Sequence, residues 1–414
     1  PKLICAGMDA HPNVAEVQRQ GCAAVWSLTA NSTRGQSATE QVGGVACVCS
    51  AMEVHPENGD VQENACGAIR NLTAYSTEIK VEATNHQAPE FICLALGRHT
   101  NRVGVLRQGL GALLNLSAGC QEAQIAVATC GGLDRIADVI QDFQDKSHLI
   151  EFACGILRNI AAGGLVIQDA VEFDVKTMQR MILNVKLAMI WQAESPLALR
   201  EAFHCIKHLC RWRGDPCKIF ASDGVDKICA GMQRHKDDAF VQQRGCEVLQ
   251  AICAHGGPPA QRIVLTAQGA ELVLAAMRNH SGDQHLQAQA CEALFHFSAA
   301  DKESGLGRRI VVSLGGPQAI CNAMTWHSGS RSVQEQGCRA LRRLMDEETS
   351  RQSAMQAGAL ASIIAAMENH GRSHVVHEDA AVALRHMDNK SESWAEVLEL
   401  GVPRLCTALT ELRE

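Results

Sequence analysis

The chain has 414 residues, of which 46% are hydrophobic, 20% are charged and only 4% are aromatic, and its net charge is −7. This length exceeds what one closed hydrophobic core usually holds, so several domains or a repeat array are expected. The acidic balance argues against a dedicated nucleic-acid-binding protein, whose domains are usually strongly basic, and no apolar run of 18 residues predicts a membrane span.

A short pattern recurs along the chain from its first residues. Each copy has an aliphatic residue, usually Met, and most copies have a His three positions later. Successive copies lie 43 to 49 residues apart. The aliphatic positions are Met8, Met52, Leu96, Ile140, Met189, Met232, Met277, Met324 and Met367. The positions three residues later are His11, His55, His99, Phe143, Gln192, His235, His280, His327 and His370. Nine registered copies indicate a tandem repeat.

One long amphipathic helix follows the turn in every copy. In the second copy, Val61, Ala65, Ile69 and Leu72 form a stripe with the period of 3.6 residues that marks a helix packed on one face. The second residue of the stripe is Gly or Ala in all nine copies, which predicts close approach of a neighbouring helix. Glycines are expected to break the chain before another apolar helix, at Gly43-Gly44, Gly131-Gly132, Gly224, Gly269, Gly315-Gly316, Gly358 and Gly401. Each copy is therefore predicted to contain three helices.

The pattern from Val61 to Leu72, Val-Gln-x-x-Ala-Cys-Gly-Ala-Ile-x-Asn-Leu, resembles the armadillo repeat. HEAT repeats are the close alternative, but they have two helices and no consistent glycine before the middle one. The resemblance covers nearly the whole chain and implies an all-α fold, an armadillo-type α-solenoid in which three-helix repeats form a right-handed superhelix.

We expect a single array over residues 1–414 that starts and ends within a repeat, with an irregular, longer repeat at about 175–224. The chain begins inside a second helix and stops soon after another one begins, at Leu405 to Leu412. Neither end looks like the polar capping repeat that an isolated solenoid needs. The array is therefore expected to continue, or a partner to cover its ends.

Cysteine and histidine are abundant, with 19 and 17 residues. Their register predicts structural roles: twelve cysteines fall at two repeat positions, which favours buried thiols in the cytoplasm or another reducing intracellular compartment. The aligned histidines are predicted to bond free carbonyls at the end of the second helix. No metal site, cofactor or small-molecule substrate is expected, and the chain has no Walker loop, Gly-x-Ser-x-Gly or His-Glu-x-x-His motif of an enzyme.

The inner face of the third helices is the surface that the pattern predicts to be functional. In armadillo peptide receptors, an Asn at one position of this helix holds the backbone of an extended peptide. The resemblance implies the same role for Asn71, Asn115 and Asn159. Importin-α-like proteins have a Trp four residues before this Asn, whereas this chain has Gly67, Gly111 and Gly155, so transport of nuclear cargo is not expected. The same face later becomes mildly basic and could suit an acidic segment; its candidate residues are His208, His296, Arg339, Arg343 and His386.

The irregular repeat contains the unusual segment Arg211-Trp212-Arg213. Two interpretations are open. The segment is a longer loop in an irregular layer, or it exposes Trp212 between two arginines as an anchor for a partner, since Trp and Arg dominate binding hot spots.

Three functions fit these features, and none involves catalysis by these residues. The first is a non-catalytic protein-protein interaction scaffold, or a structural subunit or arm of a larger assembly. The second is a receptor for an extended peptide in the third-helix groove. The third is the repeat segment of a larger signalling enzyme, such as a kinase or ubiquitin ligase. In each case the expected partners are proteins, without nucleic acid and without direct membrane insertion.

Overall fold

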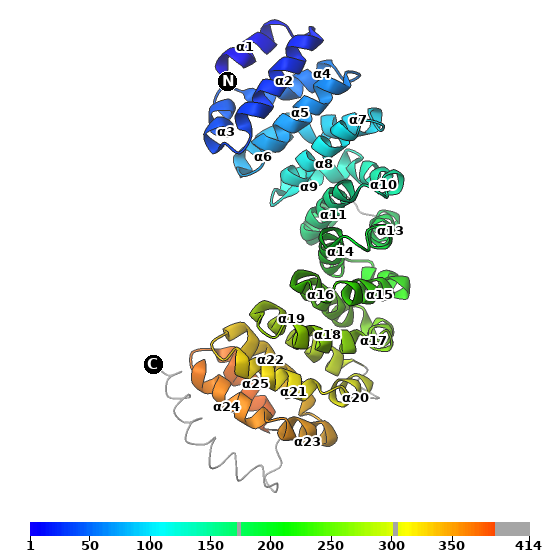
Figure 1. Ribbon diagram of the computed structural model, residues 1–414, viewed down its shortest axis with the longest axis vertical. Coiled ribbons are helices and arrows are strands. Elements are labelled where there is room, and N and C mark those ends of the chain that lie inside the picture. Colours follow the sequence, from blue (N-terminus) through cyan, green and yellow to red (C-terminus); the bar gives the residue numbers. More distant parts are fainter. Residues whose placement is uncertain (172–174, 301–304, 386–414) are drawn as a thin grey trace. The chain divides into compact units, whose positions relative to one another are not determined.

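The computed structural model describes residues 1–171, 175–300 and 305–385 (Figure 1). All regular elements of these residues are α-helices. The chain divides into two compact units, Pro1–Gly214 and Asp215–Glu414. The predicted break at Gly401 and the predicted helix at Leu405 to Leu412 lie outside the described residues.

The first unit is a stack of helices in which third helices of consecutive repeats pack side by side. α2, α5, α8, α11 and α14 form this row, and the second helices α4, α7, α10 and α13 lie beside it (Figure 1). Its elements are α1 (Lys2–Ala10), α2 (Ala15–Thr29), α3 (Thr33–Glu40), α4 (Gly44–Val54), α5 (Gly59–Leu72), α6 (Thr77–Asn85), α7 (Ala88–Arg98), α8 (Val103–Ser117), α9 (Gln121–Thr129), α10 (Gly132–Asp142), α11 (Ser147–Ala162), α12 (Gly164–Ala170), α13 (Val175–Trp191) and α14 (Pro196–Leu209).

The second unit repeats the same packing. Its third helices α16, α19, α22 and α25 form a row, with α18, α21 and α24 as second helices (Figure 1). Its elements are α15 (Pro216–Arg234), α16 (Ala239–His255), α17 (Gly257–Thr266), α18 (Gly269–Asn279), α19 (Gln284–Ala299), α20 (Leu306–Ser313), α21 (Gly316–Trp326), α22 (Arg331–Leu344), α23 (Glu348–Gln356), α24 (Ala359–Asn369) and α25 (His374–Arg385). The predicted three-helix repeat is confirmed.

Most predicted glycine breaks are present, and one is wrong. Gly43 and Gly315 have φ of 72° and 82°, a left-handed conformation that glycine adopts without strain, and each directly precedes a second helix. Gly224 instead lies inside the continuous helix α15. A Cβ atom at this position would lie 2.5 Å from the ring of Phe220, so this glycine makes room for an aromatic side chain.

The predicted core stripe is buried in the described repeats except in α2, where Val17 is partly exposed and Leu28 is exposed. Val61, Ala65, Ile69 and Leu72 have no exposed surface, and the equivalent residues of α8, α11, α16, α19 and α22 are also buried. Leu28 of α2 is 42% exposed. Within the described chain, α2 has a third-helix neighbour on one side only, which leaves Leu28 uncovered.

Where the small residue of the stripe is glycine, it packs against the registered aliphatic residue of the second helix. A Cβ atom at Gly245 would lie 2.4 Å from Met232 Sδ, and one at Gly337 would lie 2.5 Å from Met324 Cγ. The invariant small residue and the Met register, which the sequence presents as two separate features, are thus the two sides of one contact.

We expect Gly245→Ala to destabilise the protein although alanine favours helices. Replacing a helical glycine gains about 1 kcal/mol, but overpacking a core costs about 1–3 kcal/mol, so a net loss of up to about 2 kcal/mol is expected in urea denaturation. Gly7→Ala is the matched control, because Gly7 is also helical and no atom lies within 4 Å of the added carbon. Equal stabilisation by both substitutions would contradict the assigned contact.

Candidate functional site

Glutamine side chains close the C-terminal ends of the second helices. The Nε2 group of Gln62 donates to the carbonyls of Met52 at 2.9 Å and His55 at 3.0 Å. The same pair of bonds is made by Gln18, Gln242, Gln287 and Gln334. These carbonyls belong to the helix end, where intrahelical donors are absent. The Gln that follows the first core position is therefore a capping residue.

The aligned histidines connect consecutive repeats. His280 Nε2 lies 2.7 Å from the carbonyl oxygen of Lys236, and His99 Nε2 lies 2.9 Å from that of Pro56. His55, His327 and His370 make the equivalent contact. The prediction that these imidazoles bond carbonyls at the end of their own second helix is wrong. Each reaches a carbonyl in the turn of the preceding repeat.

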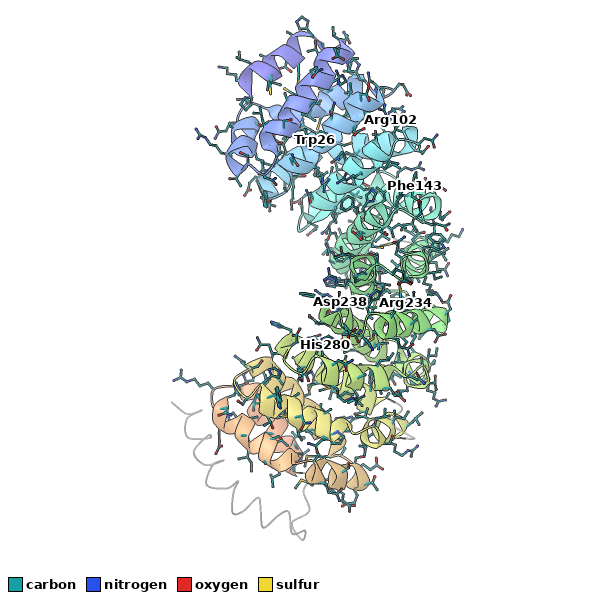
Figure 2. The ribbon with its side chains drawn as sticks, in the orientation of Figure 1. Trp26, Arg102, Phe143, Arg234, Asp238 and His280 are labelled. Atoms are coloured by element: carbon teal, nitrogen blue, oxygen red, sulfur yellow. The ribbon has the colours of Figure 1, made fainter. Side chains whose placement is uncertain are left out.

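Two repeats depart from histidine at this position. Phe143 ends α10 where His280 ends α18 (Figure 2), and its ring offers no donor. Gln192 keeps the connection, because its Nε2 donates to the carbonyl of Gln144 in the preceding repeat. An amide thus replaces an imidazole as the donor.

The three asparagines predicted to hold a peptide backbone also connect repeats. Asn71 Nδ2 donates to the Trp26 carbonyl at 3.0 Å, and Asn115 Nδ2 donates to the Arg70 carbonyl at 2.8 Å. Asn159, which is 7% exposed, donates to the Leu114 carbonyl at 3.1 Å. These bonds account for the asparagines without a ligand, so peptide capture by them stays a prediction.

The glycines in the position of the importin tryptophans make room for side chains of the preceding third helix. The ring of Trp26 (Figure 2) lies over Gly67, where a Cβ atom would be 2.5 Å from Trp26 Cδ2. Arg70 lies over Gly111 in the same way, and its guanidinium carbon is 5.2 Å from the centre of the Phe152 ring. The face is therefore filled by contacts between repeats.

The predicted basic residues are largely engaged within the protein. In the first unit, His208 Nε2 lies 3.1 Å from His204 Nε2. In the second unit, Arg343 Nη1 lies 2.7 Å from Asp346 Oδ2, and the Arg339 guanidinium stacks 4.4 Å above the Phe295 ring. His386 lies outside the described residues.

His296 has a strongly altered protonation equilibrium. Burial, followed by the nearby positive charges of Arg339 and His255, lowers the pKa of His296 to about 4. Its imidazole is therefore neutral at neutral pH. At neutral pH His296 therefore adds no positive charge to this face, whereas Arg339 does.

The prediction of Trp212 as an exposed anchor is wrong. Trp212 is only 4% exposed, and its indole Nε1 donates to the Ala161 carbonyl at 2.9 Å, at the end of α11. Arg213 forms an ion pair with Asp169 at 2.6 Å, and its backbone exchanges hydrogen bonds with the amide of Gln168. The segment, whose Arg211 side chain is exposed, is a loop fixed to α12 in an irregular layer.

The cysteines of the described residues carry free thiols. Burial raises the pKa of Cys22, Cys154 and Cys291 to about 12, which makes these thiols poor nucleophiles. Cys130 differs, because it is partly exposed and its Sγ lies 3.2 Å from Cys93 Sγ. The hydrogen bond from the Cys93 thiol lowers the pKa of Cys130, despite the opposing effect of burial.

No three His, Cys, Asp or Glu side chains converge on a metal-binding geometry in the part of the chain that the structure describes. No single helix there has both the length and the apolar composition to cross a membrane. Helices α11 and α12 reach the required length and apolar composition only when they are taken together, and the chain bends by 90° between them.

A cavity of about 250 Å³ in the second unit was not predicted from the sequence. It lies between α18 and α21, with Met277, Ala323 and Trp326 as apolar walls and Arg278 at its rim. Trp326 is 72% exposed, and Arg278 has no ion pair among the described residues. The sequence does contain one indication of this site. The residue two positions after the registered aliphatic residue is Trp326 in this copy, whereas it is Arg98 in the third copy.

The first unit has a cavity at the same repeat position, between α4 and α7. Glu53 stands there in place of Arg278, and Arg98 in place of Trp326. Arg98 is paired with Glu57 at 3.3 Å. The two cavities therefore share a backbone frame but differ in the charge and aromatic character of their rims.

Comparisons with known proteins identify the class as an armadillo-type repeat protein. The family described as LRRK2 ARM repeat matches residues 45–399, and the chain belongs to this family. No curated protein sequence matches the chain.

Solved structures confirm the fold. A crystal structure of an engineered protein from the Northeast Structural Genomics Consortium is similar with a TM-score of 0.80 and 17% identity, covering 99% of this chain and 97% of the other. Two further engineered proteins of the same consortium have TM-scores of 0.53 and 0.52, with 18% and 20% identity. They cover 62% and 61% of this chain and 97% of their own.

Acidification is expected to weaken the protein through His296. The folded-state pKa of about 4 lies below the ordinary value of 6.5, so the unfolded chain takes up a proton first as the pH falls. The stability from neutral His296 is complete above about pH 6.5 and is lost between about pH 6.5 and 4. We expect the urea midpoint to fall less in this window for His296→Gln than for the wild type, with exposed His285→Gln as the control on the same helix. Equal pH dependence of all three proteins would refute the assignment.

Cys130 is expected to react first with iodoacetamide at pH 7.5. Its lowered pKa provides more thiolate, whereas the thiols of the buried register stay protonated. Peptide mapping after short exposure should find Cys130 labelled, and Cys93→Ala should slow the labelling because the donor is lost. Earlier labelling of Cys22 or Cys154 would show that the burial pattern is wrong.

Proposed function

We propose that this chain is a non-catalytic scaffold that binds another protein through the cavity lined by Trp326. The observation that carries the proposal is the exposure of a large aromatic side chain beside an apolar cavity and an unpaired arginine. Exposed Trp and Arg are the residue types that dominate binding hot spots. The proposed partner segment carries an apolar side chain for the cavity and a neighbouring carboxylate for Arg278.

The remaining features support a role in assembly. Repeat solenoids present long surfaces for protein partners. Many of the repeated Gln, His and Asn side chains make contacts that hold consecutive helices together. The free thiols support a reducing intracellular compartment, which we propose as the place of action.

The test is capture of a specific protein by the purified chain and its loss on substitution. A partner identified by mass spectrometry with the wild type should bind Trp326→Ala at least about tenfold more weakly, as hot-spot truncation does. Arg278→Glu should also weaken binding. The loss of affinity should be larger at low salt than at high salt, because salt screens the interaction between residue 278 and the partner's carboxylate. Tyr75→Ala is the control, since Tyr75 is equally exposed elsewhere. Unchanged binding by Trp326→Ala, with an unchanged circular dichroism spectrum, would reject the proposed surface.

A further inference from the structure

Two thiols of the first unit lie at a distance from which a disulfide can form. Cys93 Sγ on α7 and Cys130 Sγ directly after α9 are 3.2 Å apart, although the residues are 37 positions apart in the chain. Since a disulfide has a sulfur–sulfur distance of about 2.05 Å, the two atoms need to approach by only about 1.1 Å. Cys130 lies beyond the last residue of α9, so its side chain can move without a change inside that helix.

The second of these thiols is a departure from the repeat. Cys93 occupies a position of the second helix that is also cysteine in α4 and α21, as Cys49 and Cys321. Cys130 stands two residues before the second helix α10. The equivalent residues before α4, α7, α18, α21 and α24 are Val42, His86, Ala267, Leu314 and Ala357. The buried thiol is thus a recurring part of the repeat, whereas among these copies only one has a second thiol at the preceding break.

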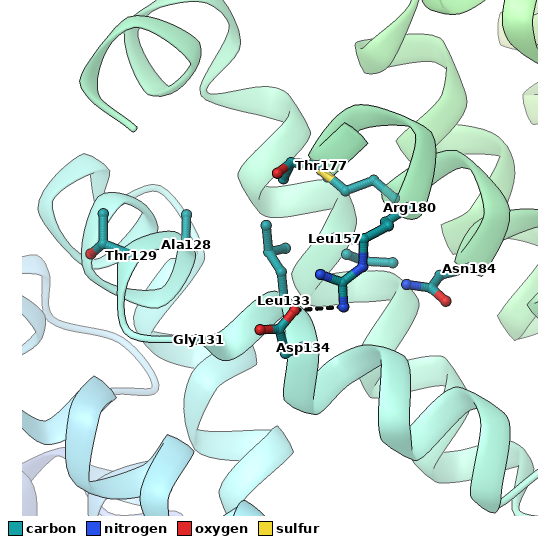
Figure 3. A pocket seen from close by; sticks show the side chains of 10 residues that line it. Ala128, Thr129, Gly131, Leu133, Asp134, Leu157, Thr177, Arg180 and Asn184 are labelled. Carbon is teal, nitrogen blue, oxygen red and sulfur yellow. Dashed lines mark ion pairs between the residues drawn. The ribbon is translucent and has the colours of Figure 1, made fainter. Parts of the chain in front are cut away.

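The two thiols differ in their access to solvent. Cys93 is 4% exposed, whereas Cys130 is partly exposed in the turn between Thr129 and Gly131. Both of these neighbours line an open cavity of about 220 Å³ (Figure 3). Redox-sensing cysteines have this arrangement, in which an accessible thiol meets the oxidant and a second thiol beside it resolves the product.

Local contacts also favour the thiolate of Cys130 over that of Cys93. The hydrogen bond with Cys93 and the backbone N–H of Gly132 lower the pKa of Cys130, although burial and the charge of Glu90 oppose them. The same hydrogen bond, together with burial, raises the pKa of Cys93 despite the positive charge of Arg135. The attacking thiol and the resolving thiol are therefore distinct.

We propose that Cys93 and Cys130 are a reversible redox pair that hydrogen peroxide converts to a disulfide. The Cys130 thiolate attacks one peroxide oxygen, so that an S–O bond forms and the O–O bond breaks. The departing hydroxide takes up the proton that Cys130 released and becomes water. The Cys93 sulfur then attacks the oxidised sulfur of Cys130; an S–S bond forms, the S–O bond breaks, and hydroxide leaves with the Cys93 proton as a second water. The two thiols lose two electrons, and the peroxide gains them.

The disulfide joins α7 to the turn before α10, and these second helices of consecutive repeats already contact each other. In a reducing compartment such a bond is transient, as disulfides of redox sensors are. The pair belongs to the first unit alone and does not depend on the cavity lined by Trp326.

The test treats the reduced full chain with an equimolar amount of hydrogen peroxide, alkylates the remaining thiols and maps the peptides without reduction. The peptides that contain Cys93 and Cys130 should appear joined. Cys5 and Cys47, which also interact but are 4% and 8% exposed, provide the internal comparison. The Cys93–Cys130 product should exceed the Cys5–Cys47 product at least about tenfold, because only Cys130 offers an accessible thiolate. Equal amounts of both products, or no joined Cys93–Cys130 peptide, would overturn the pair.

Two variants establish the order of the steps. In Cys93→Ala, dimedone should trap a sulfenic acid on Cys130, because the resolving thiol is absent. In Cys130→Ala, Cys93 should remain a free thiol under the same treatment, and its oxidation would overturn the assigned order. Cys321→Ala removes the thiol at the same position of α21 and, as the matched control, should leave the joined product unchanged. The wild-type result uses no variant, so it decides the proposal even if Cys93→Ala fails to fold.

Reduced glutathione tests the reversibility of the bond. It should return the joined product to free thiols, as it does for labile regulatory disulfides. A Cys93–Cys130 bond that resists excess glutathione would be a structural disulfide, and this result would overturn the redox pair.

Discussion

The ends of the helices determine how this structure is held together. A helix leaves its last carbonyls without intrahelical donors, and a solenoid of short helices multiplies these ends. Here the donors come from side chains at fixed repeat positions. Gln62 caps the second helix of its own repeat, while His99 and Asn115 reach carbonyls of the repeat before. Donor and acceptor between repeats lie about one repeat apart, so these bonds and the buried stripe enforce the same register.

Close packing follows from the same register. Because Gly245 admits Met232, and Gly67 admits Trp26, the third helices that carry these glycines approach their neighbouring helices closely. A carbon added at either glycine would collide with atoms of another helix. The steric role of the small residues and the polar role of the amides thus act on the same helix–helix contacts, which explains why both features recur in step.

Much of this architecture could be predicted from the sequence, because nine registered copies of one pattern make the length of the repeat unit easy to recognise. The three-helix unit, the buried stripe and the inert thiols required no knowledge of distant contacts. Single positions were harder. Gly224 looks like other breaking glycines until Phe220 is seen against it. Trp212 sits between arginines, which suggested exposure, but its indole bonds Ala161, 51 residues away. The Asn ladder suggested a ligand because its carbonyl partners, 45 residues away, are not visible in the sequence.

Departures from the repeat are more informative about function than the repeat itself. Positions that serve the scaffold recur with the same chemistry in several copies, as the capping glutamine does in five of them. Five residues before the registered aliphatic residue, Phe91 and Ala319 line cavities between second helices, and the equivalent residue of α13 is Asn184. Asn184 therefore places an amide where Phe91 and Ala319 place apolar side chains. Trp326 likewise exposes an aromatic ring where Arg98 pairs with Glu57. Trp326 is largely exposed, so contacts within the described chain do not account for its aromatic ring, and this is why we propose a partner there.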